Sequence, residues 1–266
     1  MTINEIVNFY VNEGYSFVKA RNKTAQEIIL KKFACSTVKD NVTLKGGIVM
    51  FYKSCNIRRT TADIDIDLIR YSISDDSLKK FILLLNEVDD GFKLEISKPI
   101  EELRQQNYHG KRVYLKIDDG ISNISIKLDI GVHTQFGIEQ ENFSFFLSSN
   151  STHVSLLVNP NEQIFGEKLT SLLQHGPLST RYKDIADMFF LINKNGLDKT
   201  KTERFLKSVF PIRNIKSFDD IYDMVNKTLN DNFFSKNATN PINKWLDESY
   251  EDMKASILMF LKGLTK

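Results

Sequence analysis

The segment "DIDIDL" at positions 63–68 alternates strictly between aspartate and a large aliphatic residue. Alternation with a period of two is typical of a β-strand, in which successive side chains point to opposite faces. We therefore expect Ile64, Ile66 and Leu68 to pack inward and the three aspartates to share the other face. Neighbouring carboxylates repel and raise one another's pKa values, so the pattern calls for a physical reason.

Two interpretations account for three carboxylates on one face of a strand. In the first, the face is a solvated edge or surface, where charges keep the strand soluble. In the second, it is a cation site, because Mg²⁺ prefers hard oxygen ligands from carboxylates together with substrate phosphates. A plain surface would avoid the repulsion by alternating Asp with Lys or Thr, and this favours the cation site.

A second segment, "ISNISIKLDIGV" at positions 121–132, shows the same alternation. Its aliphatic residues share one face, and Ser125, Lys127 and Asp129 share the other. If this strand lies beside the first, Asp129 joins the aspartates of the segment 63–68 on one polar face. Three carboxylates from two strands can hold two Mg²⁺ ions and orient an in-line attack at phosphorus.

A glycine pair, Gly46-Gly47, stands between an extended segment and an expected short helix at 48–54. Glycines at such a place let backbone N–H groups approach a triphosphate, with the N-terminus of the helix facing the anion. Most Gly pairs are simply turns. This pair gains significance because it lies shortly upstream of the aspartates.

The first part of the chain mixes helical and strand patterns. Helices are expected at 22–38 and 76–88, and "DDG" at 118–120 predicts a hairpin turn between two alternating segments. A further pair of extended segments is expected within 143–158. This mixture predicts an α+β fold with a mixed β-sheet core flanked by helices.

The pattern changes at Asn159, after which only helical periods occur. We expect Asn159 to cap a helix that begins at Pro160 and ends near Gly176. The chain is therefore predicted to form two domains, an α/β core over 1–158 and a C-terminal helical bundle over 159–266.

Composition limits the class of protein. With 41% hydrophobic and 26% charged residues, the chain resembles an ordinary globular protein, and a net charge of +2 is too small to indicate a nucleic-acid binder. The two cysteines lack a metal-finger spacing, and no signal peptide is recognisable. No apolar run reaches the length of about 20 residues that spans a bilayer. These features predict a cytoplasmic, soluble protein.

These residues, in this order, resemble the nucleotidyltransferase superfamily, in which a Gly-Gly or Gly-Ser turn precedes Asp-x-Asp and a later third Asp. More narrowly, the chain is similar to the AbiEii/AbiGii family, the nucleotidyltransferase toxins of bacterial abortive-infection and toxin–antitoxin systems. That family shows Lys-Gly-Gly, then Arg-x-[Ser/Thr]-x-Asp-[Ile/Leu]-Asp, a strand Asp, and a helical Lys followed by Arg and Asp. The matching residues are Lys45, Gly46, Gly47, Arg59, Thr61, Asp63, Asp65, Asp129, Lys168, Arg181, Asp184 and Asp187.

The resemblance implies a nucleotidyltransferase-like fold and a Mg²⁺-dependent reaction that transfers a nucleoside monophosphate from an NTP, with pyrophosphate leaving. Asp63, Asp65 and Asp129 would hold two Mg²⁺ ions, and Asp129 would also take the proton from the attacking hydroxyl. Lys168 and Asp184 would complete the catalytic set, and the helical domain would complete the active-site cleft. The implied nucleotide-binding residues are Lys45, Gly46, Gly47, Arg59, Thr61 and Arg181.

Two positions refine this assignment. Arg59, four residues before Asp63, favours Asp63 and Asp65 as the ligand pair and leaves Asp67 as an accessory residue at the end of the strand. After the Gly pair the family usually has Thr or Ser, whose hydroxyl can contact phosphate, whereas this chain has Ile48.

The helical matches also have plainer interpretations. Lys168 by itself is typical of an ordinary surface lysine, and the resemblance makes it a phosphate or base contact. Asp184 and Asp187 are three residues apart on one helical face near Arg181 and Lys183, which also fits a salt-bridge cluster on a helix surface.

The resemblance further implies tRNA as an acceptor, growth arrest as the outcome, and a cognate antitoxin encoded nearby. Two alternatives stand beside this enzyme: a catalytically degenerate nucleotide- or RNA-binding protein of the same fold, and a nucleotidyltransferase that modifies a protein or small molecule. Three basic clusters suit an RNA backbone, and solvated lysines on helix faces explain them equally well: Lys19/Arg21/Lys23, Lys31/Lys32 and Lys111/Arg112.

Overall fold

The computed structural model describes residues 1–103, 110–134, 138–213 and 215–264. The chain divides into two compact units, Met1–Asn159 and Pro160–Lys266, which we call the sheet unit and the helical unit. Each is described by itself. Within the described ranges, every helix is too short or too polar to cross a membrane.

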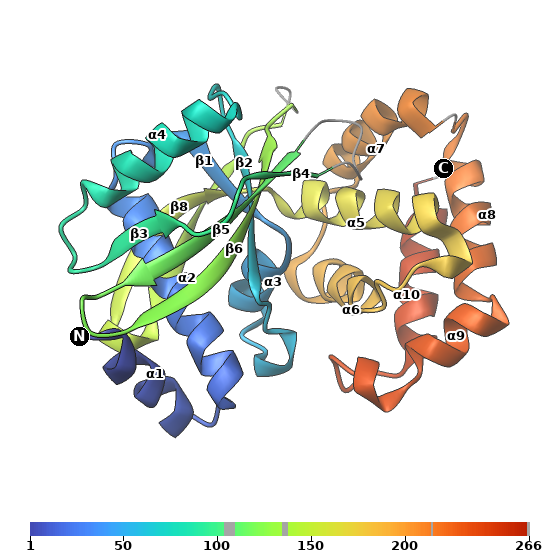
Figure 1. Cartoon of the computed structure of the whole chain (residues 1–266). Coiled ribbons are helices and arrows are strands. Elements are labelled where there is room, and N and C mark those ends of the chain that lie inside the picture. Colours follow the sequence, from blue (N-terminus) through green and yellow to red (C-terminus); the bar gives the residue numbers. More distant parts are fainter. Residues whose placement is uncertain (104–109, 135–137, 214, 265–266) are drawn as a thin grey trace. The chain divides into compact units, whose positions relative to one another are not determined.

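The sheet unit is built on a mixed sheet that has eight strands in the described residues (Figure 1). Its order is β3-β5-β6-β2-β1-β8-β7, and β4 pairs with β5. β2 runs parallel to β6 and antiparallel to β1, while β1 runs parallel to β8. The strands are β1 Val42–Lys45, β2 Asp63–Leu68, β3 Lys93–Ile96, β4 Glu101–Leu103, β5 Gly110–Asp118, β6 Asn123–Val132, β7 Glu141–Leu147 and β8 Thr152–Val158.

The helices of this unit confirm the expected segments and add one. The pattern at 22–38 is α2 and that at 76–88 is α4. The short helix expected at 48–54 is α3, which begins earlier, at Gly46, and α1 was not predicted. Thr2 and Glu5 form a capping box at the start of α1. The bounds are α1 Ile3–Asn12, α2 Phe17–Cys35, α3 Gly46–Ser54 and α4 Asp75–Asn86, with 3-10 turns Lys39–Asn41, Ile57–Arg59 and Ser148–Asn150.

The core of the sheet unit lies against the apolar side of β2. Ile64, Ile66 and Leu68 are fully buried, as the alternation predicts. α2 packs against β6 and β8 and meets α4, where the rings of Phe33 and Phe81 lie 6.0 Å apart. The aspartates of β2 are thereby left on the opposite side of the strand.

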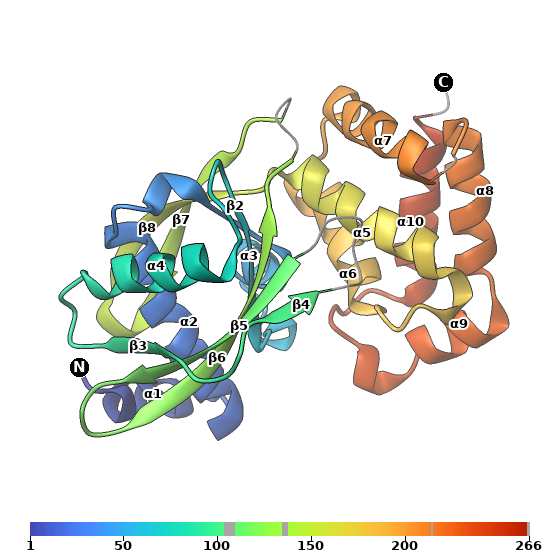
Figure 2. The same ribbon diagram turned by 45° about the horizontal axis from the view of Figure 1, so that its top comes forward.

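The strands β5 and β6 form a long twisted hairpin (Figure 2). Asp118 pairs with Asn123, so the predicted turn at 118–120 is confirmed. Asp119 Oδ1 accepts hydrogen bonds from the N–H groups of Ile121 and Ser122 at 2.9 and 2.7 Å, which closes the turn.

The helical unit begins one residue later than predicted. Its first helix, α5, starts at Asn161 with Pro160 as the cap, so the assignment of Asn159 as N-cap is wrong. Asn159 instead extends the pairing of β8 with β1: its N–H donates to the carbonyl of Leu44 at 3.0 Å. Its side chain also meets the hydroxyl of Thr43 at 3.1 Å. Asn159 therefore belongs to the sheet unit, just past the end of β8.

The helices of this unit pack around a shared apolar core. α5 packs against α7, and α10 packs against α6 and α8. A Cβ added to Gly166 would collide with the ring of Phe205, so this glycine lets α5 and α7 approach closely. The helices are α5 Asn161–His175, α6 Lys183–Phe190, α7 Lys199–Arg213, α8 Phe218–Leu229, α9 Asn232–Ala238 and α10 Tyr250–Lys262, with 3-10 turns Gly176–Leu178 and Pro241–Asn243 and a π-helical segment Leu191–Asn195 after α6.

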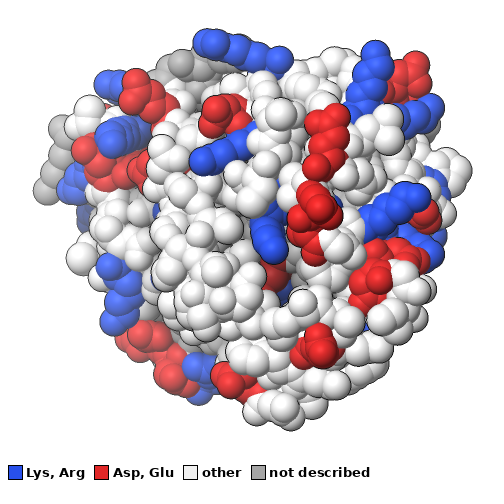
Figure 3. Space-filling view, turned by 90° about the vertical axis from the view of Figure 1, so that its left-hand side faces the viewer, with Lys and Arg blue, Asp and Glu red and all other residues white. Residues whose placement is uncertain are grey.

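Two lysines of the predicted basic clusters are buried, which contradicts both of their interpretations. Lys32 is fully buried, with its Nζ 2.8 Å from Asp90 Oδ1. Lys23 is also buried, and its Nζ donates to the hydroxyl of Tyr52 at 2.6 Å. On the face drawn in Figure 3, Lys and Arg alternate with Asp and Glu. The clusters therefore do not present an RNA backbone with all of their charges.

The surroundings of Lys23 shift its titration. Burial lowers the pKa of Lys23 to about 8, although the nearby carboxylate of Glu27 acts in the opposite direction. The Nζ also lies 3.8 Å from the centre of the Tyr52 ring. A cation over an aromatic face is partly stabilised, so the remaining shift reflects loss of water.

We predict a rise in stability with pH that Lys23→Met abolishes. Between about pH 8 and pH 10 the unfolded chain binds a proton that folded Lys23 has released, so the free energy of unfolding rises with pH. Urea unfolding at several pH values from about 7 to 9.5 measures this rise. The exposed Lys19 on the same helix supplies the control variant Lys19→Met. Parallel pH profiles for wild type and Lys23→Met would contradict the assignment.

Candidate functional site

A row of four charged residues crosses the polar side of the sheet. Lys45 of β1 is the register partner of Asp65, and Asp65 of β2 is the partner of Asp129. Asp129 of β6 is in turn the partner of Arg112 on β5. We call Lys45, Asp65, Asp129 and Arg112 the charged row. The expected pairing of the two aspartate strands is confirmed, and it places two carboxylates side by side.

The glycine pair shapes the surroundings of Asp65. Gly46 has a φ of +65°, and a Cβ at this position would collide with Asp65 Oδ2 and lie 2.9 Å from its Cγ. The N–H of Gly47 donates a hydrogen bond to Asp65. Burial raises the pKa of the Asp65 carboxyl and the neighbouring Asp129 adds to the rise, while Lys45 and the Gly47 N–H oppose it. The N-terminus of α3 therefore holds this carboxylate.

The residues around the glycines are closely packed. A Cβ on Gly47 would lie 3.0 Å from the Thr61 side chain, and Gln26 of α2 donates to the Thr61 carbonyl at 2.8 Å. Arg59 is buried in the turn that precedes Thr61. Ile48 is fully buried, so the position after the Gly pair packs in the core of this chain.

The other two aspartates of β2 each meet a lysine. Asp63 Oδ1 lies 2.9 Å from the Nζ of Lys127, its register partner on β6. Asp67 is buried and accepts a hydrogen bond from Lys45 Nζ at 2.6 Å. Asp67 therefore anchors Lys45 in the structure.

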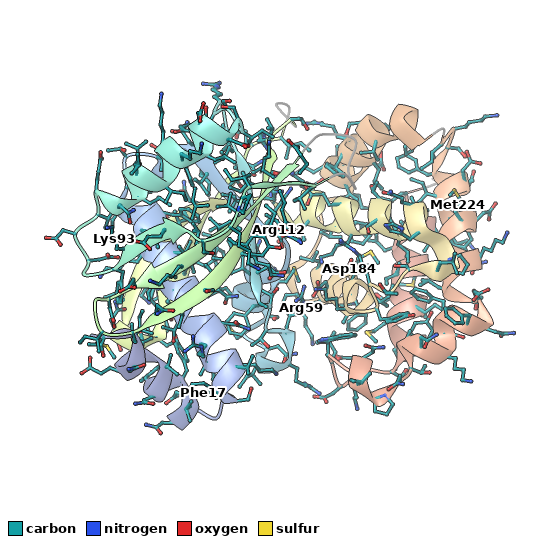
Figure 4. All side chains as sticks on the ribbon, in the orientation of Figure 1. Phe17, Arg59, Lys93, Arg112, Asp184 and Met224 are labelled. Carbon is teal, nitrogen blue, oxygen red and sulfur yellow. The ribbon has the colours of Figure 1, made fainter. Side chains whose placement is uncertain are left out.

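Asp129 is bound by an arginine that the motif analysis did not assign. Arg112 Nε lies 2.7 Å from Asp129 Oδ1, and its Nη2 lies 2.8 Å from Oδ2. Arg112 is labelled on β5 in Figure 4. The register of the hairpin carries the signal that was missed: counting back from the pair Asp118–Asn123 places Arg112 opposite Asp129.

The candidate residues of the helical unit form a separate buried cluster. Lys168 Nζ on α5 lies 2.8 Å from Asp184 Oδ1 and 2.6 Å from Asp187 Oδ2 on α6. All three side chains are buried, so the interpretations as a surface lysine and a surface salt-bridge cluster are wrong. Arg181 is 57% exposed, with its Nη1 3.9 Å from Asp184 Oδ2. Figure 4 labels Asp184.

The donor set of the sheet unit suits a divalent cation in its chemistry. Asp63 and Asp65 provide hard oxygen ligands on one face, and the turn at Gly46 leaves no room there for a side chain. Across the described residues, no group of three or more His, Cys, Asp and Glu side chains is placed to hold a metal ion. This agrees with the engagement of Asp129 by Arg112. The role of Asp129 as a metal ligand stays a prediction.

The close approach of Gly46 to Asp65 predicts that Gly46→Ala lowers the free energy of unfolding. The positive φ costs about 1–2 kcal/mol for a residue with a Cβ, and the collision with the carboxylate adds about 1–3 kcal/mol. Gly120→Ala is the matched control, because Gly120 has a φ of +81° and no atom within 4 Å of an added Cβ. Urea unfolding measures the free energy of unfolding of both variants.

Both alanine variants bear the cost of a positive φ, so the difference between their free energies of unfolding reports the collision with Asp65 alone. It shrinks when Asp65→Ala is combined with Gly46→Ala, since the carboxyl group is then gone. Equal losses in Gly46→Ala and Gly120→Ala would show that Asp65 does not depend on the glycine.

Comparison with known proteins places this chain in a family. A family model described as "Nucleotidyl transferase AbiEii toxin, Type IV TA system" matches residues 28–263. No curated protein sequence matches the chain. Similar solved structures include JHP933 from Helicobacter pylori, with 14% identity, a TM-score of 0.46, and coverage of 93% of this chain and 91% of that one.

Another similar structure is an antigenic nucleotidyltransferase-like protein from Paracoccidioides brasiliensis, with 15% identity and a TM-score of 0.40. The alignment covers 77% of this chain and 91% of that chain. The family match covers both units, including the Gly pair, the charged row and the Lys168 cluster. The chain belongs to the AbiEii nucleotidyltransferase toxin family of type IV toxin–antitoxin systems.

Proposed function

We propose that this nucleotidyltransferase transfers a nucleoside monophosphate from an NTP to an acceptor in a Mg²⁺-dependent reaction that releases pyrophosphate. The observation that carries the proposal is the pairing of Asp65 with Asp129, with Asp63 on the same face and Gly46 against the Asp65 carboxylate. Two adjacent carboxylates repel each other, and a cation bound beside them turns this repulsion into affinity.

The side chains of the sheet unit have distinct tasks in this proposal. Asp63 and Asp65 would hold the cation, which would supply positive charge against the triphosphate. The N-terminus of α3 presents backbone N–H groups, and the one of Gly47 already orients Asp65. Lys45, held by Asp67, contributes a positive charge at the end of the row. Asp129 would take the proton of the attacking hydroxyl once Arg112 no longer holds both of its oxygens.

The helical unit contributes the remaining candidates. Lys168 is held by two carboxylates, so the buried cluster with Asp184 and Asp187 has a formal charge of −1. Arg181 is the exposed cation beside this cluster and suits a phosphate of the nucleotide. Removing Lys168 would leave two buried carboxylates without their partner, which costs stability whatever its role in catalysis. We therefore test the reaction first on Asp63 and Asp65.

The family match supports a biological role as the toxin of a pair with a cognate antitoxin. We propose that the reaction takes place in the bacterial cytoplasm, that the acceptor is tRNA, and that the modification arrests growth during abortive infection. Basic residues that remain exposed, such as Lys19, rather than the buried Lys23 and Lys32, would meet the RNA backbone.

We predict that Asp63→Asn and Asp65→Asn each lower the rate by about 100-fold or more, because loss of several kcal/mol of charge stabilisation has that effect. Purified protein is incubated with Mg²⁺ and each α-labelled NTP, with and without total tRNA, and transfer of label and pyrophosphate release are measured. Asp76→Asn is the control, since Asp76 is an exposed carboxylate on α4 of the same unit. Its rate is expected to equal that of wild type.

The outcomes separate the alternatives. Transfer of label to a protein or small molecule, and not to tRNA, would overturn the proposed acceptor. Binding of NTP without pyrophosphate release would identify a nucleotide-binding protein that lacks turnover. Full activity in Asp65→Asn would show that the cation site lies elsewhere.

A further inference from the structure

Arg112 binds the carboxylate of Asp129, the third carboxylate of the proposed cation site. Both oxygens of Asp129 accept hydrogen bonds from one guanidinium, at 2.7 and 2.8 Å. Such paired charge-assisted hydrogen bonds are stronger and more directional than single contacts. The two side chains are only partly exposed, 28% for Arg112 and 20% for Asp129, so water screens the contact incompletely.

The three carboxylates differ in what they must exchange to bind a cation. Asp63 meets a single ammonium group, that of Lys127, whose side chain is 37% exposed. Asp65 receives a backbone N–H from Gly47, which leaves further acceptor sites on its two oxygens. Asp129 is held at both oxygens. A cation that binds Asp129 therefore competes with the positive charge of the guanidinium.

Deprotonation does not release Arg112. An arginine side chain is always charged in proteins. One cation has to be exchanged for another. The strand pairing keeps the guanidinium in place for this exchange, because Arg112 and Asp129 are register partners.

We propose that Arg112 is a positioning residue that holds Asp129 as an internal counter-ion, so that a divalent cation binds first at Asp63 and Asp65 and reaches Asp129 only by displacing the guanidinium. The inference rests on the proposed function, because it concerns the same cation site. Arg112 thereby separates a first, stronger cation site from a second, weaker one that depends on Asp129.

The test is Mn²⁺ binding to the full chain without nucleotide, followed by electron paramagnetic resonance of the free ion. Wild type is expected to bind one Mn²⁺ tightly and a second one weakly. Arg112→Gln removes the competing charge and is expected to strengthen the second site by about 10-fold or more, since a hydrogen bond to a charged group has about that strength. Asp129→Asn combined with Arg112→Gln is expected to abolish the gain.

Two variants serve as controls for charge and fold. Lys116→Gln removes a positive charge from the same face of β5, where Lys116 pairs with Asp118, and is expected to leave Mn²⁺ binding unchanged. Arg112→Lys keeps the charge but loses the paired geometry. Arg112→Lys is expected to strengthen Mn²⁺ binding at the second site by a smaller factor. If urea unfolding shows that Arg112→Gln is not folded, Arg112→Lys alone tests the role of Arg112.

The outcomes distinguish this inference from the proposed function. If Mn²⁺ binds to wild type and is lost in Asp65→Asn, but folded Arg112→Gln and Arg112→Lys show an unchanged or weaker second site, only the role of Arg112 is overturned. If neither wild type nor Arg112→Gln binds Mn²⁺, the cation site of the proposed function is overturned with it.

Discussion

The parallel pairing of β2 with β6 determines which side chains share the polar side of the sheet. In this register Asp65 lies opposite Asp129, while Ile64 and Ile66 are fully buried on the other side. A slip by one residue would carry the aspartates into the core and the isoleucines to the polar side. Burial of such aliphatic side chains contributes about 1.5–3 kcal/mol each. The hydrophobic core therefore holds two repelling carboxylates side by side.

The position of Asp129 beside the aspartates of β2 was expected on the condition that the two strands pair, as they do. Alternation in the sequence was enough to predict β2, β6 and their inward faces, because a period of two tells which face each side chain occupies. It does not state which residue of the next strand stands opposite. For Asp129 that information lies in the hairpin turn at 118–120, which sets Arg112 as its partner. The turn was predicted, but its consequence for the site requires counting along both strands.

The buried lysines could not be predicted, because a helical period identifies a face without deciding what covers it. Lys23 depends on Tyr52, 29 residues away, and Lys168 depends on Asp184, 16 residues away. A charge is costly to bury without a partner, so a lysine resembles a surface residue until its partner is known. The same reasoning explains why the Lys168 cluster resembled a surface feature. Ile48 drew attention because it lacks the hydroxyl that is usual at this position, and the sequence did not show that it packs in the core.

The charged row contains two positive and two negative side chains, so its formal charges cancel within the chain itself. An electrically balanced row needs no metal ion in order to fold, unlike a cluster of bare carboxylates. Folding is then expected to be independent of the supply of divalent cations. In the proposed reaction, cation availability would set the rate and leave the folded fraction of the protein unchanged.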